Sequence, residues 1–112
     1  MITLDALRAL GADVDDGLKR CMNMEAFYLR MVSSLQGDTR MDDLKAALDA
    51  KDLDRAFEHA HALKGVYGNL SLTQLYVPIQ EMTELLRSRT DTDYAPLMAR
   101  LLEEKARLDA LF

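Results

Sequence analysis

The sequence contains a single cysteine, Cys21, and therefore cannot form an internal disulfide bond or provide four cysteine ligands for zinc. This scarcity excludes the small secreted proteins that depend on disulfides and favours a reducing, cytoplasmic compartment. No apolar run approaches the ~20 residues that a membrane-spanning helix requires, and the opening stretch MITLDALRALGADVDDG is interrupted by acids. We therefore expect a soluble protein with neither a membrane span nor a signal peptide.

The sequence also lacks any block of basic residues. Its 14 lysines and arginines are outnumbered by 19 acids, which gives a net charge of -5, and the two signs are mixed along the whole chain. A protein that follows a phosphate backbone usually carries a basic stripe or patch. We expect a monomer that binds neither nucleic acid nor a membrane.

Proline and glycine are scarce, with only two and five copies in 112 residues. Apolar residues recur at intervals of three and four almost everywhere, whereas no β-branched run alternates with polar residues. This pattern predicts an all-α protein. Short connections between amphipathic helices favour an antiparallel up-down four-helix bundle with an additional short N-terminal helix. A chain of this length buries roughly two-thirds of its unfolded surface, so we expect residues 1–112 to form one domain.

In the first third of the chain, the spacing of apolar residues predicts the short helix and one or two further helical segments. The short helix covers residues 3–10 and ends at Gly11, a residue type that favours the left-handed conformation after a helix. Asp13 is a candidate N-cap for the second segment and Asn23 for the third, which stops at Gly37. These two segments are either separate helices or one helix with a break near Asn23. The third segment has one apolar stripe, formed by Phe27, Tyr28, Met31, Val32 and Leu35.

In the rest of the chain, the spacing of apolar residues predicts four helices separated by short turns. The first begins at residues 38–39, Asp52 caps the second, and the last begins near residues 91–93. Pro78 lies well inside the third, which predicts a kink unless that helix starts later, near Tyr76. The inward face of the helix that Asp52 caps consists of Leu53, Ala56, Phe57, Ala60, Leu63 and Tyr67.

The helix that follows Asp52 contains both histidines of the chain, in the segment EHAHALKGVYG at residues 58–68. At about 100° per residue, His61 lies about 100° from the centre of the apolar face, and His59 lies about 200° from His61. The two side chains therefore cannot share one ligand, and no suitably spaced cysteine completes a metal site with them. We expect His61 at the boundary of the buried face and His59 at the solvated surface.

Two glycines follow His61, although each glycine costs a helix about 1 kcal/mol relative to alanine. Gly65 and Gly68 lie four and seven residues after His61 and so share its side of the helix. We infer that they leave a bare strip of backbone along which something large can approach the imidazole. Lys64, three residues after His61, can bring its ammonium group toward an anion carried by that ring.

The stretch AHALKGVYGNL, residues 60–70, resembles the signature of histidine-containing phosphotransfer (Hpt) domains, an A-H-x-L-K-G core followed by small residues and a second glycine. A second stretch, GLKRCMNMEAFYLRMVSSL at residues 17–35, is similar to the family's earlier G-x-x-R…Y segment. Gly17, Arg20 and Tyr28 carry this second similarity. The resemblance therefore covers most of the chain.

The sequence departs from the family pattern at a few positions. Many members have a further glycine where this chain has Ser71, and small residues usually stand at the positions of Val66 and Tyr67. Tyr67 falls on the core face, and Ser71 can serve as a helix cap. Pro78 is also unusual for the family.

The resemblance implies a phosphorelay intermediate in which His61 accepts a phosphoryl group from an aspartyl phosphate on a receiver domain and passes it to another receiver. The receiver would belong to a response regulator or to a hybrid sensor histidine kinase. Lys64 would stabilise the phosphate, and Gly65 and Gly68 would give the receiver access. A neutral imidazole, whose ordinary pKa is about 6.5, can attack phosphorus without a dedicated base.

The sequence has no P-loop, ATP motif or Mg²⁺-binding acid cluster. The metal needed for transfer would therefore come from the receiver. We expect this protein to hold no cofactor and no metal of its own and not to be an enzyme by itself, because it would supply only half of an active site.

A second interpretation is a phosphate-independent helical interaction module that keeps the same fold and binds a partner through an apolar groove. Met22, Met24 and Met31 could form an adaptable docking patch, although packing in the core or at its edge is the role we expect for them. Cys21 is expected to be a small buried residue. The initiating methionine and the compact length favour a free-standing protein over a domain of a hybrid kinase.

Overall fold

The computed structural model describes residues 2–112. Within that range the chain forms helices and no strand, and none of these helices is both long enough and apolar enough to cross a membrane. The predicted all-α class is confirmed. The helices are α1 (Leu4–Leu10), α2 (Val14–Arg20), α3 (Glu25–Ser33), α4 (Arg40–Asp49), α5 (Leu53–Asn69), α6 (Thr73–Arg87) and α7 (Ala95–Asp109).

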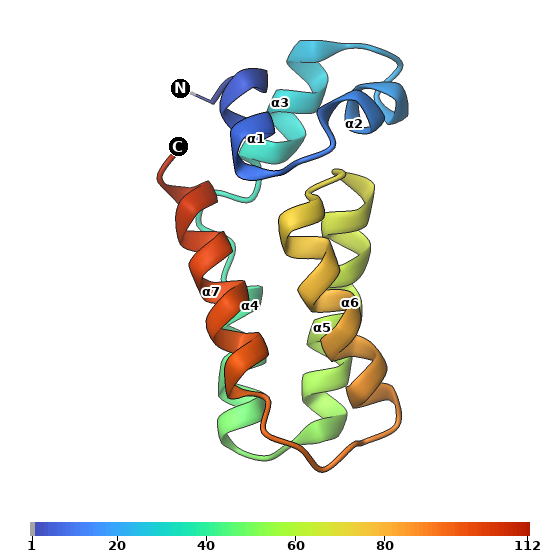
Figure 1. The fold of residues 1–112 in the computed structure, drawn as a ribbon, viewed down its shortest axis with the longest axis vertical. Coiled ribbons are helices and arrows are strands. Elements are labelled where there is room, and N and C mark those ends of the chain that lie inside the picture. The colour runs from blue at the N-terminus through green and yellow to red at the C-terminus, as the bar shows by residue number, and fades with distance from the viewer. Residues whose placement is uncertain (1) are drawn as a thin grey trace.

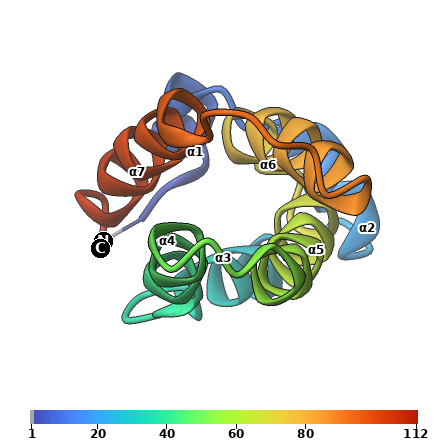
Figure 2. The same ribbon diagram turned by 90° about the horizontal axis from the view of Figure 1, so that it is seen from below.

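Helices α4 to α7 form the predicted bundle, in which each helix packs against the next one along the chain. They run along the longest dimension of the molecule, which measures 41 × 24 × 19 Å. The part of the chain before them forms three short helices, α1 to α3, which lie at one end of the bundle (Figure 1). Seen along the bundle axis, α4, α5, α6 and α7 follow one another around a common centre (Figure 2).

Several helices begin and end where local capping groups predict. The side chains of Thr3, Asp13 and Asp52 each accept a hydrogen bond from the backbone amide three residues later, at the start of α1, α2 and α5. Gly11 follows α1 with a φ of 103°, the left-handed conformation that the absence of a side chain permits. These boundaries agree with the sequence because they depend on residues close together in the chain.

The break between α2 and α3 is confirmed, but the prediction that Asn23 caps the third helix is wrong. Met22 and Asn23 both have left-handed backbone conformations, with φ of 56° and 59°. The residue that precedes α3 is Met24, whose side chain makes no capping hydrogen bond. Asparagine is one of the few residue types that tolerate the left-handed conformation, so Asn23 belongs to the turn.

Only part of the predicted apolar stripe of α3 faces the core. Tyr28 and Val32 are fully buried, whereas Phe27 and Met31 are each 41% exposed. The helix α3 lies beyond the end of the four bundle helices, so they do not surround it (Figure 1). The apolar stripe therefore extends beyond the buried face of α3 at Phe27 and Met31.

The methionines around α3 are also more exposed than predicted. Met22 and Met24 are 82% and 56% exposed, so the expectation that they pack in the core or at its edge is wrong. Cys21, next to them, is buried as predicted. The turn between α2 and α3 thus presents flexible apolar side chains to solvent.

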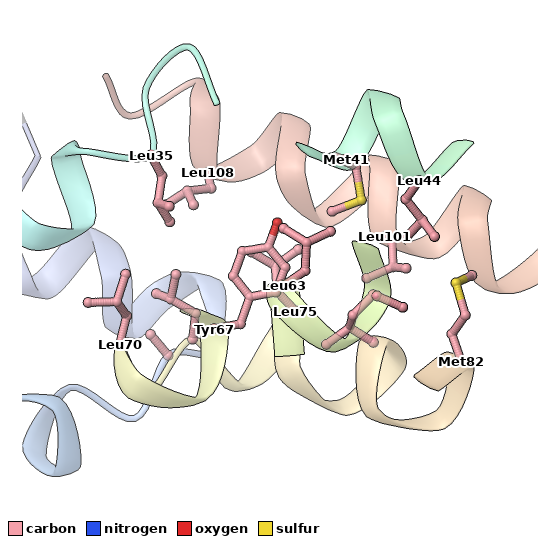
Figure 3. Close-up of a cluster of buried hydrophobic side chains, with 14 of the residues drawn as sticks. Leu35, Met41, Leu44, Leu63, Tyr67, Leu70, Leu75, Met82, Leu101 and Leu108 are labelled. Atoms are coloured by element: carbon pink, nitrogen blue, oxygen red, sulfur yellow. The ribbon is translucent and has the colours of Figure 1, made fainter. Parts of the chain in front are cut away.

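The main core lies between the four bundle helices (Figure 3). It contains Met41 and Leu44 of α4, Leu63 and Tyr67 of α5, Leu75 and Met82 of α6, and Leu101 and Leu108 of α7. The inward face predicted for α5 is confirmed, because Ala56, Ala60, Leu63 and Tyr67 are buried there. Leu53 and Phe57 lie at the edge of that face and are half-buried.

The helix α6 runs through Pro78 from Thr73 to Arg87, so the alternative helix start near Tyr76 is wrong. Proline has no N–H, and the carbonyl of Gln74 therefore lacks its usual intrahelical donor. The Pro78 side chain is buried and contributes apolar surface to the core. The kink stays a prediction.

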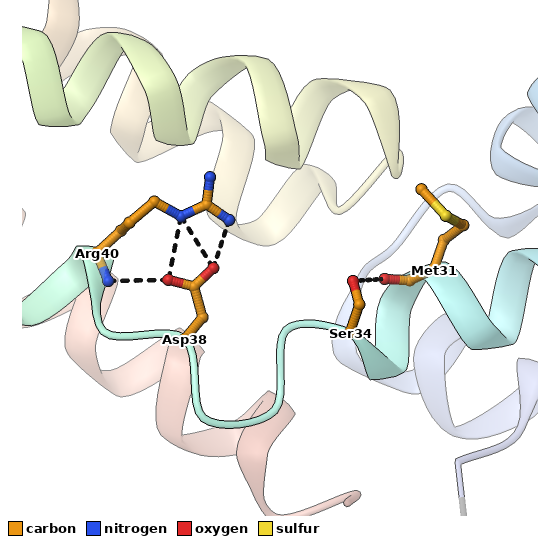
Figure 4. Close-up of polar contacts among 4 residues, drawn as sticks. All are labelled: Met31, Ser34, Asp38 and Arg40. Carbon is orange, nitrogen blue, oxygen red and sulfur yellow. Dashed lines mark hydrogen bonds and ion pairs between the residues drawn. The ribbon is translucent and has the colours of Figure 1, made fainter.

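The connection between α3 and α4 is held by Asp38 and Arg40 (Figure 4). The Asp38 carboxylate accepts a hydrogen bond from the Arg40 backbone amide at 2.8 Å and from the Arg40 Nε at 2.9 Å. The side-chain hydrogen bond from Arg40 lowers the pKa of Asp38 below its ordinary value. The predicted restart of the helix at residues 38–39 is confirmed, since α4 begins at Arg40.

Gly17 allows the ring of Tyr28 to pass directly over α2. A Cβ at position 17 would lie 2.5 Å from Cε1 of Tyr28. The Tyr28 hydroxyl donates a hydrogen bond of 2.8 Å to the carbonyl of Leu70, the C-cap residue of α5. Burial raises the pKa of this hydroxyl to about 12, so it remains a donor at neutral pH. Gly17 and Tyr28 therefore tie the N-terminal helices to the end of α5.

We expect Gly17→Ala to destabilise the protein by about 1 to 3 kcal/mol, the usual cost of overpacking a filled interior. The Tyr28 ring cannot move away easily, because it is fully buried and its hydroxyl is held by Leu70. Urea unfolding measures the effect, and Gly65→Ala is the matched control, since a Cβ at Gly65 meets nothing within 4 Å. An unchanged free energy of unfolding for Gly17→Ala would show that the ring adjusts without cost.

Candidate functional site

His61 lies near the middle of α5 with its side chain exposed. The imidazole stacks against the ring of Phe57, one turn earlier, with the ring centroids 5.6 Å apart. Beside it is an open hollow of about 520 Å³, formed where α2, α5 and the start of α6 meet. The hollow is lined by Asp13, Asp16, Arg20, His61, Lys64, Gly65, Gly68, Asn69, Ser71, Thr73 and Tyr76.

The two glycines after His61 differ in their surroundings. Gly65 is exposed, and a Cβ there would have no neighbour within 4 Å. A Cβ at Gly68 would lie 3.0 Å from Cε1 of Tyr76 on α6. Gly68 therefore lets α5 and α6 approach each other, whereas Gly65 leaves open space next to His61.

Lys64 lines the same hollow, and its side chain is 25% exposed. Its ammonium group lies 3.8 Å from the carboxylate of Glu84 on α6. Glu84 also pairs with Arg87, one turn later, at 3.4 Å. Lys64 is thus loosely paired at the edge of the hollow and keeps part of its side chain in solvent.

The helix α2 contributes Arg20 and Asp16 to the hollow. The Arg20 Nε and the Ser71 hydroxyl both donate hydrogen bonds to the Asp16 carboxylate, at 2.8 and 2.5 Å. The Ser71 bond, followed by the Arg20 bond, lowers the pKa of Asp16, which therefore stays ionised at neutral pH. Arg20 thus lines the same hollow as Lys64 and is paired there with the Asp16 carboxylate.

Ser71 takes a different role from the predicted helix cap. Its hydroxyl is bonded to Asp16, and the residue before α6 is Leu72, which makes no side-chain capping bond. Ser71 itself has a φ of 55° in the turn after α5. A left-handed backbone conformation favours glycine, which is the residue that many members of the resembled family have at this position.

His59 lies on a different side of α5 from His61. It is half-buried and lines a separate hollow with residues of α4 and of the first turns of α5, among them Asp43 and Arg55. The predicted angular separation of the two histidines is confirmed, although His59 is less solvated than predicted. Within residues 2–112, no group of three histidine, cysteine or acidic side chains is arranged to hold a metal ion.

Comparison with known families settles the relationship, because the sequence model of the Hpt domain matches residues 32–111. The chain belongs to the Hpt domain family. Hpt domains are phosphotransfer shuttles of phosphorelay signalling, with a helical-bundle fold, and they typically interact with receiver domains. The resemblance stated from the sequence is confirmed. No match was found among curated proteins or among solved structures.

The match to the Hpt domain begins within α3, so α1 and α2 lie before the matched region. Asp16 and Arg20 therefore reach the hollow of this Hpt domain from outside the matched segment. The sequence similarity included Arg20 but gave no reason to place it near His61. Phe57 and Glu84 were also missed as neighbours of the site. A spacing of four residues between Phe57 and His61 was the available signal for the first of them.

Proposed function

We propose that this Hpt domain relays phosphoryl groups between two receiver domains and that His61 is the phosphoacceptor. The observation that carries the proposal is the setting of His61. Its imidazole is exposed beside a position without a side chain, Gly65, and shares an open hollow with the cations Lys64 and Arg20. The open position at Gly65 admits a bulky macromolecule, and Lys64 and Arg20, although balanced in the hollow by Asp13 and Asp16, can pair with a dianionic group.

The transfer is a displacement at phosphorus. The unprotonated ring nitrogen of His61 attacks the phosphorus of an aspartyl phosphate on the receiver, while the other ring nitrogen keeps its proton. The N–P bond forms as the P–O bond to the aspartyl carboxylate breaks, and the carboxylate leaves with the electron pair. The second receiver reverses this step with its own aspartate. Metal ions that neutralise the phosphoryl oxygens belong to the receiver.

Lys64 would contribute positive charge on the side of the Hpt domain. We expect Lys64→Ala to slow phosphoryl acceptance by about 10- to 150-fold, since one charge-assisted hydrogen bond is worth about 1.5 to 3 kcal/mol. Rapid-quench transfer from a phosphorylated receiver measures the rate. Lys45→Ala is the control, because Lys45 is an exposed lysine on α4 that pairs with Asp49. Equal rates for the wild-type and Lys64→Ala proteins would remove Lys64 from the site.

One observation favours the second candidate function, a phosphate-independent interaction module. Met22, Met24, Phe27 and Met31 expose apolar surface around the turn before α3 and on α3 itself. Flexible methionines are frequent at surfaces that bind partners. In that case the protein would bind its partner with the same affinity whether or not phosphate is present.

The deciding experiment uses receiver domains charged with acetyl phosphate. The wild-type Hpt domain is incubated with each charged receiver, and the product is tested for phosphate that is labile in acid and stable in base, the behaviour of phosphohistidine. We expect such phosphate to accumulate on the Hpt domain and to pass to a second, uncharged receiver. Binding of receivers without any transfer would support the interaction module and contradict the relay.

A further inference from the structure

Phe57 is a half-buried aromatic residue whose ring lies against the imidazole of His61. The ring centroids are 5.6 Å apart and the planes are inclined by 26°. Side chains on a helix lean toward its N-terminus, so the imidazole leans onto the residue one turn earlier. This separation lies within the range of about 4.5 to 7 Å in which aromatic rings attract each other.

Two arginines, Arg87 at the end of α6 and Arg89 in the turn after it, lie over the ring of Phe57. The guanidinium carbons of Arg87 and Arg89 lie 5.1 and 4.9 Å from the ring centroid. The face of an aromatic ring attracts cations, so both contacts favour this position of the ring. Arg89 is itself anchored, since its Nε donates to Asp54 and its Nη1 to the Leu86 carbonyl, both at 2.6 Å.

Ion pairs also connect the arginine above Phe57 to Lys64. Arg87, which lies over Phe57, pairs with Glu84 at 3.4 Å, and Glu84 lies 3.8 Å from Lys64. The contacts therefore begin and end on α5, at two side chains of the proposed phosphoacceptor site. Phe57 is the member that touches the imidazole.

We propose that Phe57 is a positioning residue, which holds the imidazole of His61 in the orientation needed for phosphoryl transfer. This inference rests on the proposed function of His61. The His61 side chain is exposed and makes no hydrogen bond within residues 2–112, and its stack with Phe57 restricts its rotation. Attack on phosphorus requires the nitrogen in line with the bond that breaks, so a freely rotating ring reacts more slowly.

The test compares Phe57→Leu, which keeps apolar bulk, with Phe57→Tyr, which keeps the aromatic ring. Each protein receives phosphate from a charged receiver and, separately, from phosphoramidate, whose N–P bond breaks and releases ammonia as the imidazole attacks. The small donor needs no protein docking. We expect Phe57→Leu to slow acceptance from both donors by about two- to tenfold, the range that aromatic pairs contribute, and Phe57→Tyr to accept at nearly the wild-type rate.

The second readout is the NMR spectrum of the imidazole. Stacking against Phe57 shifts the ring protons of His61 upfield, and we expect that shift to disappear in Phe57→Leu and to persist in Phe57→Tyr. Acceptance at the wild-type rate by Phe57→Leu, or unchanged His61 resonances in that variant, would overturn the positioning role. A wild-type protein that accepts phosphate on His61 from phosphoramidate but from no receiver would instead overturn the relay and leave this comparison valid.

Discussion

Replacing His61 with glutamine is expected to abolish phosphoryl acceptance and to leave the fold intact. Glutamine keeps a polar side chain of similar size but has no nucleophilic ring nitrogen. Because His61 is exposed and its side chain makes no hydrogen bond within residues 2–112, the loss of its stacking contact with Phe57 should lower the free energy of unfolding by no more than about 1.5 kcal/mol. Transfer of radiolabelled phosphate from a charged receiver measures acceptance, and a melting curve checks the fold.

The matched control is His59→Gln, which removes the other histidine of α5. His59 lines a different hollow, beside α4, and should not meet the phosphoryl group. We expect the His59 variant to accept phosphate like the wild-type protein. Retained acceptance in His61→Gln together with lost acceptance in a folded His59→Gln would show that the wrong histidine has been assigned.

Gly65 provides the second prediction, in which stability and transfer change in opposite directions. Gly65 is exposed and lies inside α5 without a positive φ, and a Cβ there would have no neighbour within 4 Å. Gly65→Ala should therefore raise the free energy of unfolding by up to about 1 kcal/mol. Gly65→Gln should be no less stable than the wild-type protein. It should nevertheless accept phosphate much more slowly, because its side chain occupies the space that a docked receiver needs.

Melting curves and receiver-to-Hpt transfer rates for the three proteins decide this prediction. Ala46→Gln adds the same side chain to an exposed position near His59 and should leave the transfer rate unchanged. A Gly65→Gln protein that melts well below the wild-type protein would show that the glycine serves packing. If that variant transfers at the wild-type rate, the receiver docks elsewhere.

The parts of the fold that the sequence predicted are those set by neighbouring residues. Asp13 and Asp52 cap their helices through amides three residues away, and Gly11 ends α1 by its own conformational freedom. The inward face of α5 follows from helical periodicity alone. The exposed side of α3 could not be predicted in this way, because periodicity identifies an apolar stripe but not how much of it a neighbouring helix covers. Phe27 and Met31 show that difference.

The candidate site likewise contains residues that spacing within one helix predicts and residues that only the packing of helices brings in. His61, Lys64 and Gly65 lie on one helix, so their spacing was sufficient to bring them together. Arg20 and Asp16 join them only because α2 lies at the end of the bundle, where Ser71 bonds to Asp16 from 55 residues away. The packing of Tyr28 over Gly17 and the hydrogen bond from Tyr28 to Leu70 join the same parts of the chain, and helical periodicity predicts neither contact.

The site of phosphorylation in the wild-type protein tests the central claim most directly. After transfer from a charged receiver, the protein is digested at neutral or alkaline pH, which preserves phosphohistidine, and the modified residue is located by tandem mass spectrometry. We predict a single phosphoryl group on His61. Phosphate on His59 or on an acidic residue, with His61 unmodified, would contradict the account.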